Sequence, residues 1–328
     1  MSENRSVPAA AAFADADSDA EKLSPSLFSV FLFVTFLSVL LFPAPSVYAD
    51  FGESGWTIFN KAQSARFRAI SAASPVAGDL SGVFYNPAVL GTDKRKEIFF
   101  LSELGASEVK LGGVVYGQPL KNGMLAIGAV YFDAGMMELN WIDDFGNILT
   151  ENVTAQRDIM GLVSYGHRFS DKFYGGVTAK AATSEIAQRD SAFAYAGDAG
   201  ILFSPANGLY LAAAVQNAGG STKFTDKTNP LPTSGYVGGG YGIKHGSLSV
   251  FPAAGVTYDS IDKEVLPEAG VELGFGLLSL NAGYRFNVSE SNFHIGLGLN
   301  TKNFDFGYAY IPGVYLNASH RFSVGMKL

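Results

Sequence analysis

The side chains best suited to chemistry in this 328-residue chain are a set of acidic, basic and imidazole groups near its C-terminal end. Each lies in a segment where apolar and polar residues alternate, and each falls on the polar side. In a strand that crosses a membrane, charges facing lipid are costly, so these groups should point inward. They could form a selectivity or anchoring patch, or simply pair and be solvated in a polar interior. The set comprises Glu268, Glu272, Arg285, His294, Asp305, Arg321 and Lys327.

The sequence gives little support for enzyme or metal chemistry. His294 and Ser279, on neighbouring segments, could be imagined as a base and a nucleophile, but no nucleophile motif surrounds either residue. The histidines are scattered, and none has a second histidine or a cysteine at ligand spacing: His167, His245, His294 and His320. We therefore expect no catalytic residues, no metal and no cofactor.

The alternation itself is the clearest structural signal. In residues 293–300 large apolar side chains take every odd position, while His294, two glycines and Asn300 take the even ones. The same two-residue period recurs in residues 278–287, 303–310 and 321–328. Side chains of a strand point alternately to its two faces, so each segment predicts a strand with one apolar face. A soluble sandwich also alternates, but its outer face carries more charge than this one.

Composition narrows the class to a membrane β-barrel. Charged residues make up 16% of the chain and aromatic residues 13%, whereas soluble proteins average about 25% charged. No run of about 20 apolar residues occurs, which excludes a bundle of membrane-spanning helices. A closed antiparallel barrel is the remaining way to pair every backbone amide in lipid, and its alternation explains a mean hydropathy of only +0.16. The net charge of −7 provides no basic stripe for nucleic acid.

The N-terminus predicts export. Residues 27–42 form an apolar core that leads to Val47-Tyr48-Ala49 before Asp50, as in a signal peptide spanning 27–49 and cleaved near Ala49. An uncleaved anchor is the alternative, and residues 1–26 form an atypical, acidic leader. Cleavage leaves 328 − 49 = 279 residues, enough for about 14 strands of about 10 residues. A cell outer membrane location follows, with outer-membrane lipid and the barrel assembly machinery as partners.

Turn residues divide the remainder into strands and loops. Fifteen candidate strands occur, and we discard the weak piece at 136–142 to reach an even number near 14. Longer loops are expected at 135–152 and 218–233, on the cell exterior. Pro252 lies within a strand and removes a backbone donor, so it predicts a bulge or a kink that could open the wall sideways.

A motif in residues 65–91 combines an Arg-Ala start, an acidic-Ser turn and a Tyr-Asn-Pro-Ala-x-Leu ending. Further landmarks are Asp198-Ala-Gly-Ile-Leu-Phe, Val215-Gln-Asn-Ala-Gly219 and Leu231-Pro-Thr233. With these features the chain resembles the PorV/PorQ group of FadL-like outer-membrane proteins. The resemblance implies an N-terminal plug at 50–92 and a transmembrane barrel at 93–328. The plug motif comprises Asp79, Ser81, Tyr85, Asn86, Pro87 and Ala88.

Two functions fit this resemblance. The first is passive transport of hydrophobic small molecules across the outer membrane, which predicts a hydrophobic ligand and a continuous apolar track through the lumen. The second is a barrel that does not transport and instead binds partner proteins of a type IX-like secretion and surface-attachment system. It predicts a sealed lumen and an exposed docking rim.

Overall fold

In the computed structural model, the described part of the chain comprises residues 55–61, 64–71, 80–105, 109–224, 228–288, 292–313 and 318–328. The predicted leader at 1–26, the signal peptide at 27–49 and Asp79 of the motif lie outside these residues. Within the described residues, no helix is long and apolar enough to cross a membrane.

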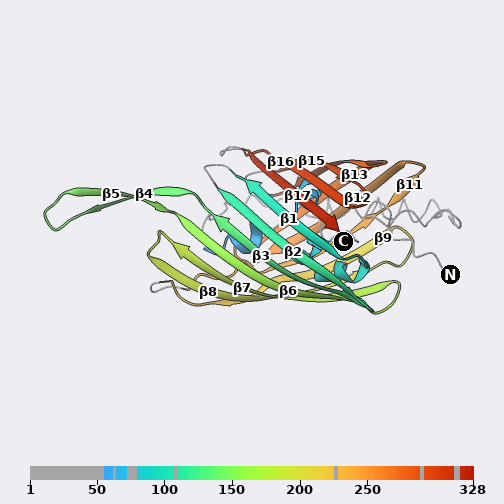
Figure 1. Ribbon diagram of the computed structural model, residues 1–328, viewed down its shortest axis with the longest axis horizontal. Helices are drawn as coiled ribbons and strands as arrows, with labels where there is room; N and C mark the ends of the chain where they lie inside the picture. The colour runs from blue at the N-terminus through green and yellow to red at the C-terminus, as the bar shows by residue number, and fades with distance from the viewer. Residues whose placement is uncertain are drawn as a thin grey trace.

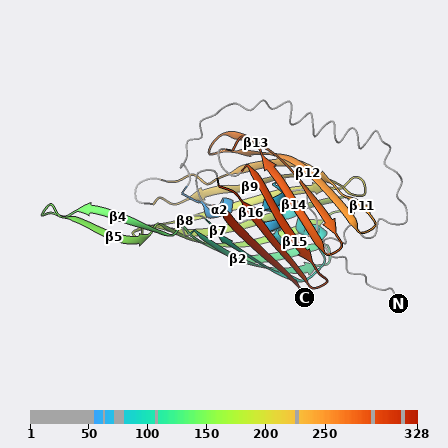
Figure 2. The same cartoon turned by 90° about the horizontal axis from the view of Figure 1, so that it is seen from above.

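The described strands form a closed antiparallel wall (Figures 1 and 2). Its first half consists of β1 (Glu97–Leu104), β2 (Lys110–Leu120), β3 (Gly123–Asp133), β6 (Gln156–Arg168), β7 (Phe173–Ile186), β8 (Asp190–Phe203) and β9 (Leu209–Ser221). The second half consists of β10 (Ser234–Tyr241), β12 (Leu248–Asp259), β13 (Glu264–Phe275), β14 (Leu278–Arg285), β15 (Phe293–Asn300), β16 (Phe304–Ile311) and β17 (Ser319–Lys327). Among the described residues these are fourteen strands, as predicted.

Two pairings close the ring. β1 pairs with β17 from Glu97↔Lys327 to Leu104↔His320, which joins the first strand to the last. β10 pairs with β12, and β11 (Ile243–His245) continues β10 beyond Gly242 in the same register on β12. Because each strand is hydrogen-bonded on both sides, the backbone groups of the wall are satisfied without water.

The wall presents its apolar residues outward. In β15 the side chain of Leu297 is 58% exposed and that of Phe293 is 50% exposed, whereas His294 between them is fully buried. Phe304, Phe306 and Phe322 continue the outer face on the next two strands. This arrangement confirms the alternation predicted from sequence and gives the exterior that acyl chains require.

Two loop predictions need correction. Residues 135–152 are not an irregular loop, because β4 (Met136–Ile142) and β5 (Ile148–Thr154) pair with each other as a hairpin. The discarded segment 136–142 is therefore a strand, although it stands outside the wall. β9 continues to Ser221 against β8, so its connection to β10 begins later than residue 218.

The interior is occupied by short helices that precede the wall in sequence: α2 (Ile58–Lys61), α3 (Ala65–Ile70), η2 (Leu80–Phe84) and η3 (Pro87–Thr92). α3 packs against β13 to β17, and η3 packs against β6, β7 and β8. Their apolar side chains form one buried cluster with inward residues of the wall, including Trp56, Phe67, Leu80, Leu90 and Met124. Ala88 and Val89 of η3 form a second cluster with Leu202 and Ala212, and Ala65 and Ala69 of α3 form a third with Ala309, so helices and wall are packed together throughout.

We expect Leu297→Arg to destabilise the barrel, because it places a charge on the lipid-facing side near the middle of β15. The expected loss is about 2–4 kcal/mol in the free energy of unfolding from lipid vesicles. Urea titration monitored by tryptophan fluorescence measures it. Asn303→Arg, in the exposed turn that follows β15, is the matched control and should be near neutral; equal losses for both variants would contradict the outward placement of Leu297.

Candidate functional site in the barrel interior

Asn86 forms a fixed corner between η2 and η3. Its side-chain oxygen accepts a hydrogen bond from the Ala88 amide at 3.0 Å, and its side-chain nitrogen donates to the Ile201 carbonyl of β8 at 3.0 Å. Pro87 occupies the first turn of η3, where its missing N–H costs nothing. Asn86 and Ser81 are fully buried. The motif residues that the structure describes thus hold a capped turn against the inner wall.

Glycines in three adjacent strands let this corner approach the wall. A Cβ at Gly176 of β7 would lie 2.4 Å from the Pro87 carbonyl, and one at Gly166 of β6 would lie 2.6 Å from it. A Cβ at Gly200 of β8 would come within 2.1 Å of the Asn86 side-chain oxygen. No side chain fits in these spaces, so the three glycines form a seat for η3.

A β-bulge in β9 turns two consecutive side chains inward. The register with β8 shifts between Gly197 and Ala199, and Asn217 adopts a left-handed conformation with φ of 57°. An extra residue in one strand has this effect. Gln216 donates to the Phe84 carbonyl of η2 at 2.7 Å, while Asn217 is buried beside it.

Asn217 joins a buried ion pair between Lys180 and Asp198. The Lys180 ammonium lies 2.7 Å from the Asp198 carboxylate and donates to the Asn217 side-chain oxygen at 2.8 Å. The Asn217 amide donates to Asp198 at 2.8 Å, and its side-chain nitrogen donates to the Pro232 carbonyl at 3.1 Å. Thr233 donates to the Asn217 carbonyl at 2.9 Å. Three of the sequence landmarks therefore meet at this cluster, which ties the β9–β10 connection to the inner wall.

α3 is anchored on the opposite side of the interior. Arg66 makes a bidentate ion pair with Glu272, with contacts of 2.6 and 2.9 Å. Ser71 shares a hydrogen bond of 2.7 Å with His294 Nδ1. Phe67 meets the Tyr85 ring edge-on at 4.8 Å, which connects α3 to η2. Planar guanidinium–carboxylate pairs fix orientation as well as position, so Arg66 sets the direction of α3.

The other charged residues identified in the sequence form pairs between neighbouring strands. Glu268 pairs with Arg285 at 3.3 Å. Arg321 contacts Glu103 of β1 in a buried pair. Opposite charges directly across an antiparallel ladder stabilise it, which explains their positions on registered residues.

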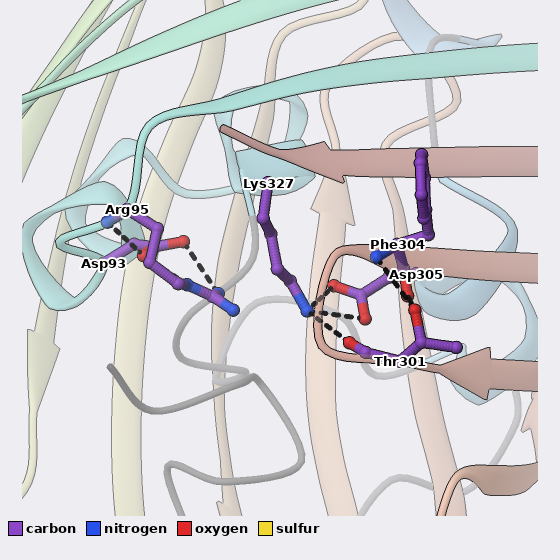
Figure 3. Close-up of polar contacts among 6 residues, drawn as sticks. All are labelled: Asp93, Arg95, Thr301, Phe304, Asp305 and Lys327. Atoms are coloured by element: carbon purple, nitrogen blue, oxygen red, sulfur yellow. Dashed lines mark hydrogen bonds and ion pairs between the residues drawn. The ribbon is translucent and has the colours of Figure 1, made fainter. Parts of the chain in front are cut away.

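Two further polar groups lie where β1 begins and β17 ends (Figure 3). Lys327 contacts Asp305 at 2.6 Å and donates to the Thr301 carbonyl at 3.3 Å. Arg95 makes two hydrogen bonds of 3.0 Å with Asp93. Both contacts lie at the end of the barrel where the chain enters the wall, and the Lys327–Asp305 contact joins β17 to β16.

In most of these ion pairs and hydrogen-bonded pairs, the sequence analysis identified one residue and missed its partner. Lys180 is a lone charge between alanines of β7, and this position is the signal in the sequence that could have found the cluster. Glu103, Arg66 and Ser71 could not be paired without the register of β1 and the position of α3. The imagined Ser279–His294 pair does not form, because Ser279 lies opposite Gly298, four residues from His294 along β15. Among the described residues, no three potential metal ligands converge.

The backbone pairing beside Pro252 differs on its two sides. Toward β13 the ladder runs without a break through Pro252↔Val271. On the other side β10 pairs with β12 as far as Gly240↔Ala253, and β11 resumes in the same register at Ile243↔Val250, while Tyr241 stays paired with Leu209 of β9. Pro252, which has no backbone donor, thus faces the junction between β10 and β11 without a shift in register.

Comparison with known proteins identifies the family. The family model described as type IX secretion system membrane protein PorP/SprF matches residues 154–326, more than half of the chain. The chain belongs to the PorP/SprF family. Its match covers the wall from β6 to β17 and thus the Lys180–Asp198–Asn217 cluster. No curated protein matches the sequence.

The fold of this PorP/SprF-family barrel is similar to that of solved outer-membrane structures. The crystal structure of the Pseudomonas putida toluene transporter TodX aligns with a TM-score of 0.54 at 11% identity, covering 81% of this chain and 98% of that one. A second TodX structure from the same organism gives 0.52 at 10% identity, covering 81% and 97%. At these identities the likeness concerns the fold alone. The matched family and these structures are secretion and transport barrels, not enzymes.

The seat for η3 yields a test. Gly176→Ala should destabilise the barrel by about 1–3 kcal/mol, because its methyl group would overlap the Pro87 backbone. Gly161→Ala on β6 is the matched control, since a Cβ there meets nothing within 4 Å. Urea unfolding and protease protection of residues 80–92 measure the effect. Equal behaviour of the two variants would show that η3 does not sit on this glycine.

The Lys180–Asp198 pair yields a second test. Lys180→Met should cost about 3–5 kcal/mol, because it leaves the Asp198 carboxylate buried without its cation. The double variant Lys180→Met/Asp198→Asn removes both charges and keeps the amide geometry, so it should regain most of the loss. Urea unfolding of the two proteins in the same vesicles measures the difference. A double variant as unstable as the single one would contradict this account.

Proposed function

We propose that this barrel is a partner-binding subunit of a type IX secretion system in the outer membrane and that its lumen is sealed. The observation that carries the proposal is the occupied interior. The described helices α2, α3, η2 and η3 form apolar clusters with the wall and are anchored to it through Arg66, Asn86 and Gln216. A segment held on opposite sides of the interior suits a closed scaffold better than a channel.

The described cavities also favour this reading. One, of about 40 Å³, is lined in part by Arg66, Glu97 and Asp305. Another, of about 160 Å³, is lined in part by Lys244, Glu272 and Asn300. The first cavity includes Phe99 and Phe306 but has room for only one or a few waters. Apolar ligands occupy cavities lined by aliphatic and aromatic groups, whereas the second cavity is lined mainly by charged and polar side chains and glycines. On this proposal, residues 50–92 act as a plug, and secretion-system proteins are the partners.

Passive transport of hydrophobic small molecules is the second candidate. Pro252 favours it, since a proline at the junction between β10 and β11 cannot donate to the ladder, and a weakened ladder would give such a molecule a sideways path to lipid. The fold likeness to the toluene transporter TodX agrees with this idea. We further propose that the landmarks meeting at Asn217 reflect kinship with the PorV/PorQ group.

Purified protein in liposomes separates the two candidates. The proposed function predicts no swelling in small sugars and no faster uptake of a fluorescent fatty acid than in protein-free liposomes. In the native cell, deletion of the gene should abolish surface attachment of exported proteins, measured by surface proteolysis, and the full chain should restore it. Fast uptake that falls with Pro252→Val would favour transport instead, and surface attachment without the gene would refute the proposed function.

A further inference from the structure

The β4–β5 hairpin is the one described part of the sheet structure that stands apart from the wall. Its strands pair only with each other, through seven residue pairs from Met136↔Thr154 to Ile142↔Ile148. It extends beyond one end of the barrel, away from the C-terminus (Figures 1 and 2). The wall turns at the opposite end are short, which is typical of the periplasmic side, so the hairpin reaches outside the cell.

The hairpin tip carries the most exposed large apolar side chains of the described residues. Phe145 is 89% exposed, Ile148 is 74% exposed and Ile142 is 70% exposed. Ile142 and Ile148 are the last residue pair, so they stand side by side on one face of the hairpin. Lipid-facing residues of the wall have a bilayer to cover them, whereas these three extend past it. We call Ile142, Phe145 and Ile148 the tip cluster.

The turn that presents the tip cluster is held in one conformation. The Asp143 carboxylate accepts hydrogen bonds from the Phe145 amide at 2.9 Å, the Asn147 amide at 2.8 Å and the Asn147 side chain at 2.9 Å. These bonds lower the pKa of Asp143 and keep its carboxylate charged. Gly146 adopts φ of 85°, which a glycine accommodates without strain. A preorganised apolar tip loses little entropy on binding.

The opposite face of the hairpin is already engaged with the barrel. The Arg189 guanidinium of the β7–β8 turn lies 5.1 Å from the centre of the Trp141 ring and 3.3 Å from Glu151. At the hairpin base, far from the tip, Gln188 also donates to Thr154 at 3.2 Å on the other face. The hairpin is thus braced on its Trp141 face, and the tip cluster stays open.

The charge of the hairpin indicates what can cover the tip. Residues 136–154 contain four acidic side chains, Glu138, Asp143, Asp144 and Glu151, and no lysine or arginine. Burying this hairpin in lipid would carry those carboxylates with it, and anionic headgroups would repel them. A protein surface that combines an apolar pocket with lysine or arginine at its rim complements both features.

We propose that the tip cluster docks into an apolar pocket with a basic rim on a partner protein outside the cell. Phe145 is the anchor, and Asp144 beside it faces the rim. The proposal rests on the proposed function, because it names the surface through which a partner-binding barrel would engage its partner. Interfaces of this kind owe most of their affinity to one or two aromatic anchors.

Binding of a defined probe to the full chain in nanodiscs tests the proposal. The probe is a fluorescent amphipathic peptide of leucine and lysine, followed by anisotropy. We expect Phe145→Ser to weaken binding by about 30-fold, the effect of losing an aromatic anchor, and Asp144→Asn by about 3-fold at low salt. Phe169→Ser and Asp171→Asn, exposed at the other end of the barrel, are the matched controls and should bind like the unmodified protein.

Three outcomes would overturn the proposal. They are equal binding by Phe145→Ser and the unmodified protein, equal binding of a leucine–glutamate peptide, and stronger binding to phosphatidylglycerol vesicles through Phe145. Cells that carry Phe145→Ser separate this inference from the proposed function. Their surface attachment of exported proteins should be lost, as in the deletion. Normal attachment in these cells but not in the deletion would refute the role of the tip cluster and leave the proposed function intact.

Discussion

A strand in a bilayer has no water to satisfy its amides, and this constraint governs the whole molecule. It forces the wall to close, which the β1–β17 and β10–β12 pairings accomplish. Closure in turn separates an apolar outside from a confined inside, so charged side chains can be placed only in the interior or at the ends. The buried pairs Glu103–Arg321 and Lys180–Asp198 are a result of that separation. The interior also needs material to fill it, and the N-terminal helices supply it.

The helices fit the interior because the wall lacks side chains where they touch it. Gly166, Gly176 and Gly200 admit η3, and a Cβ at Gly270 or Gly283 would overlap the backbone of Ile70 at the end of α3. The N-terminal helices are thus held at two contacts on opposite sides of the lumen, one at η3 and one at α3. The family of secretion membrane proteins to which the chain belongs, and its protruding hairpin, are compatible with a scaffold whose working surface lies at its end.

The sequence predicted the wall well and the contacts across it poorly, for physical reasons. Alternation in residues 278–328 reflects the lipid-facing exterior of each strand separately, so it needs no partner to be recognised. Segment 136–142 is weak as a strand signal and exceeds the even number of a barrel, because it belongs to a hairpin whose two faces meet solvent near its tip. The partners of Lys180 depend on register and on a one-residue bulge, and the role of Gly176 depends on a backbone brought from ninety residues away. Neither follows from local composition.

Because of the bulge in β9, the number of residues in that strand decides which of its side chains point inward. Before it, even-numbered residues such as Ala212 and Ala214 point inward, and after it Asn217 and Ser221 do so. Loss of Gln216 would remove the bulge and restore a single parity with the inner and outer sets unchanged, whereas loss of a residue nearer Leu209 would exchange the two sets between the deletion and the bulge. In homologous barrels, residues next to this bulge should therefore tolerate substitution. A deletion between Leu209 and the bulge should occur only together with a compensating insertion, and the reverse.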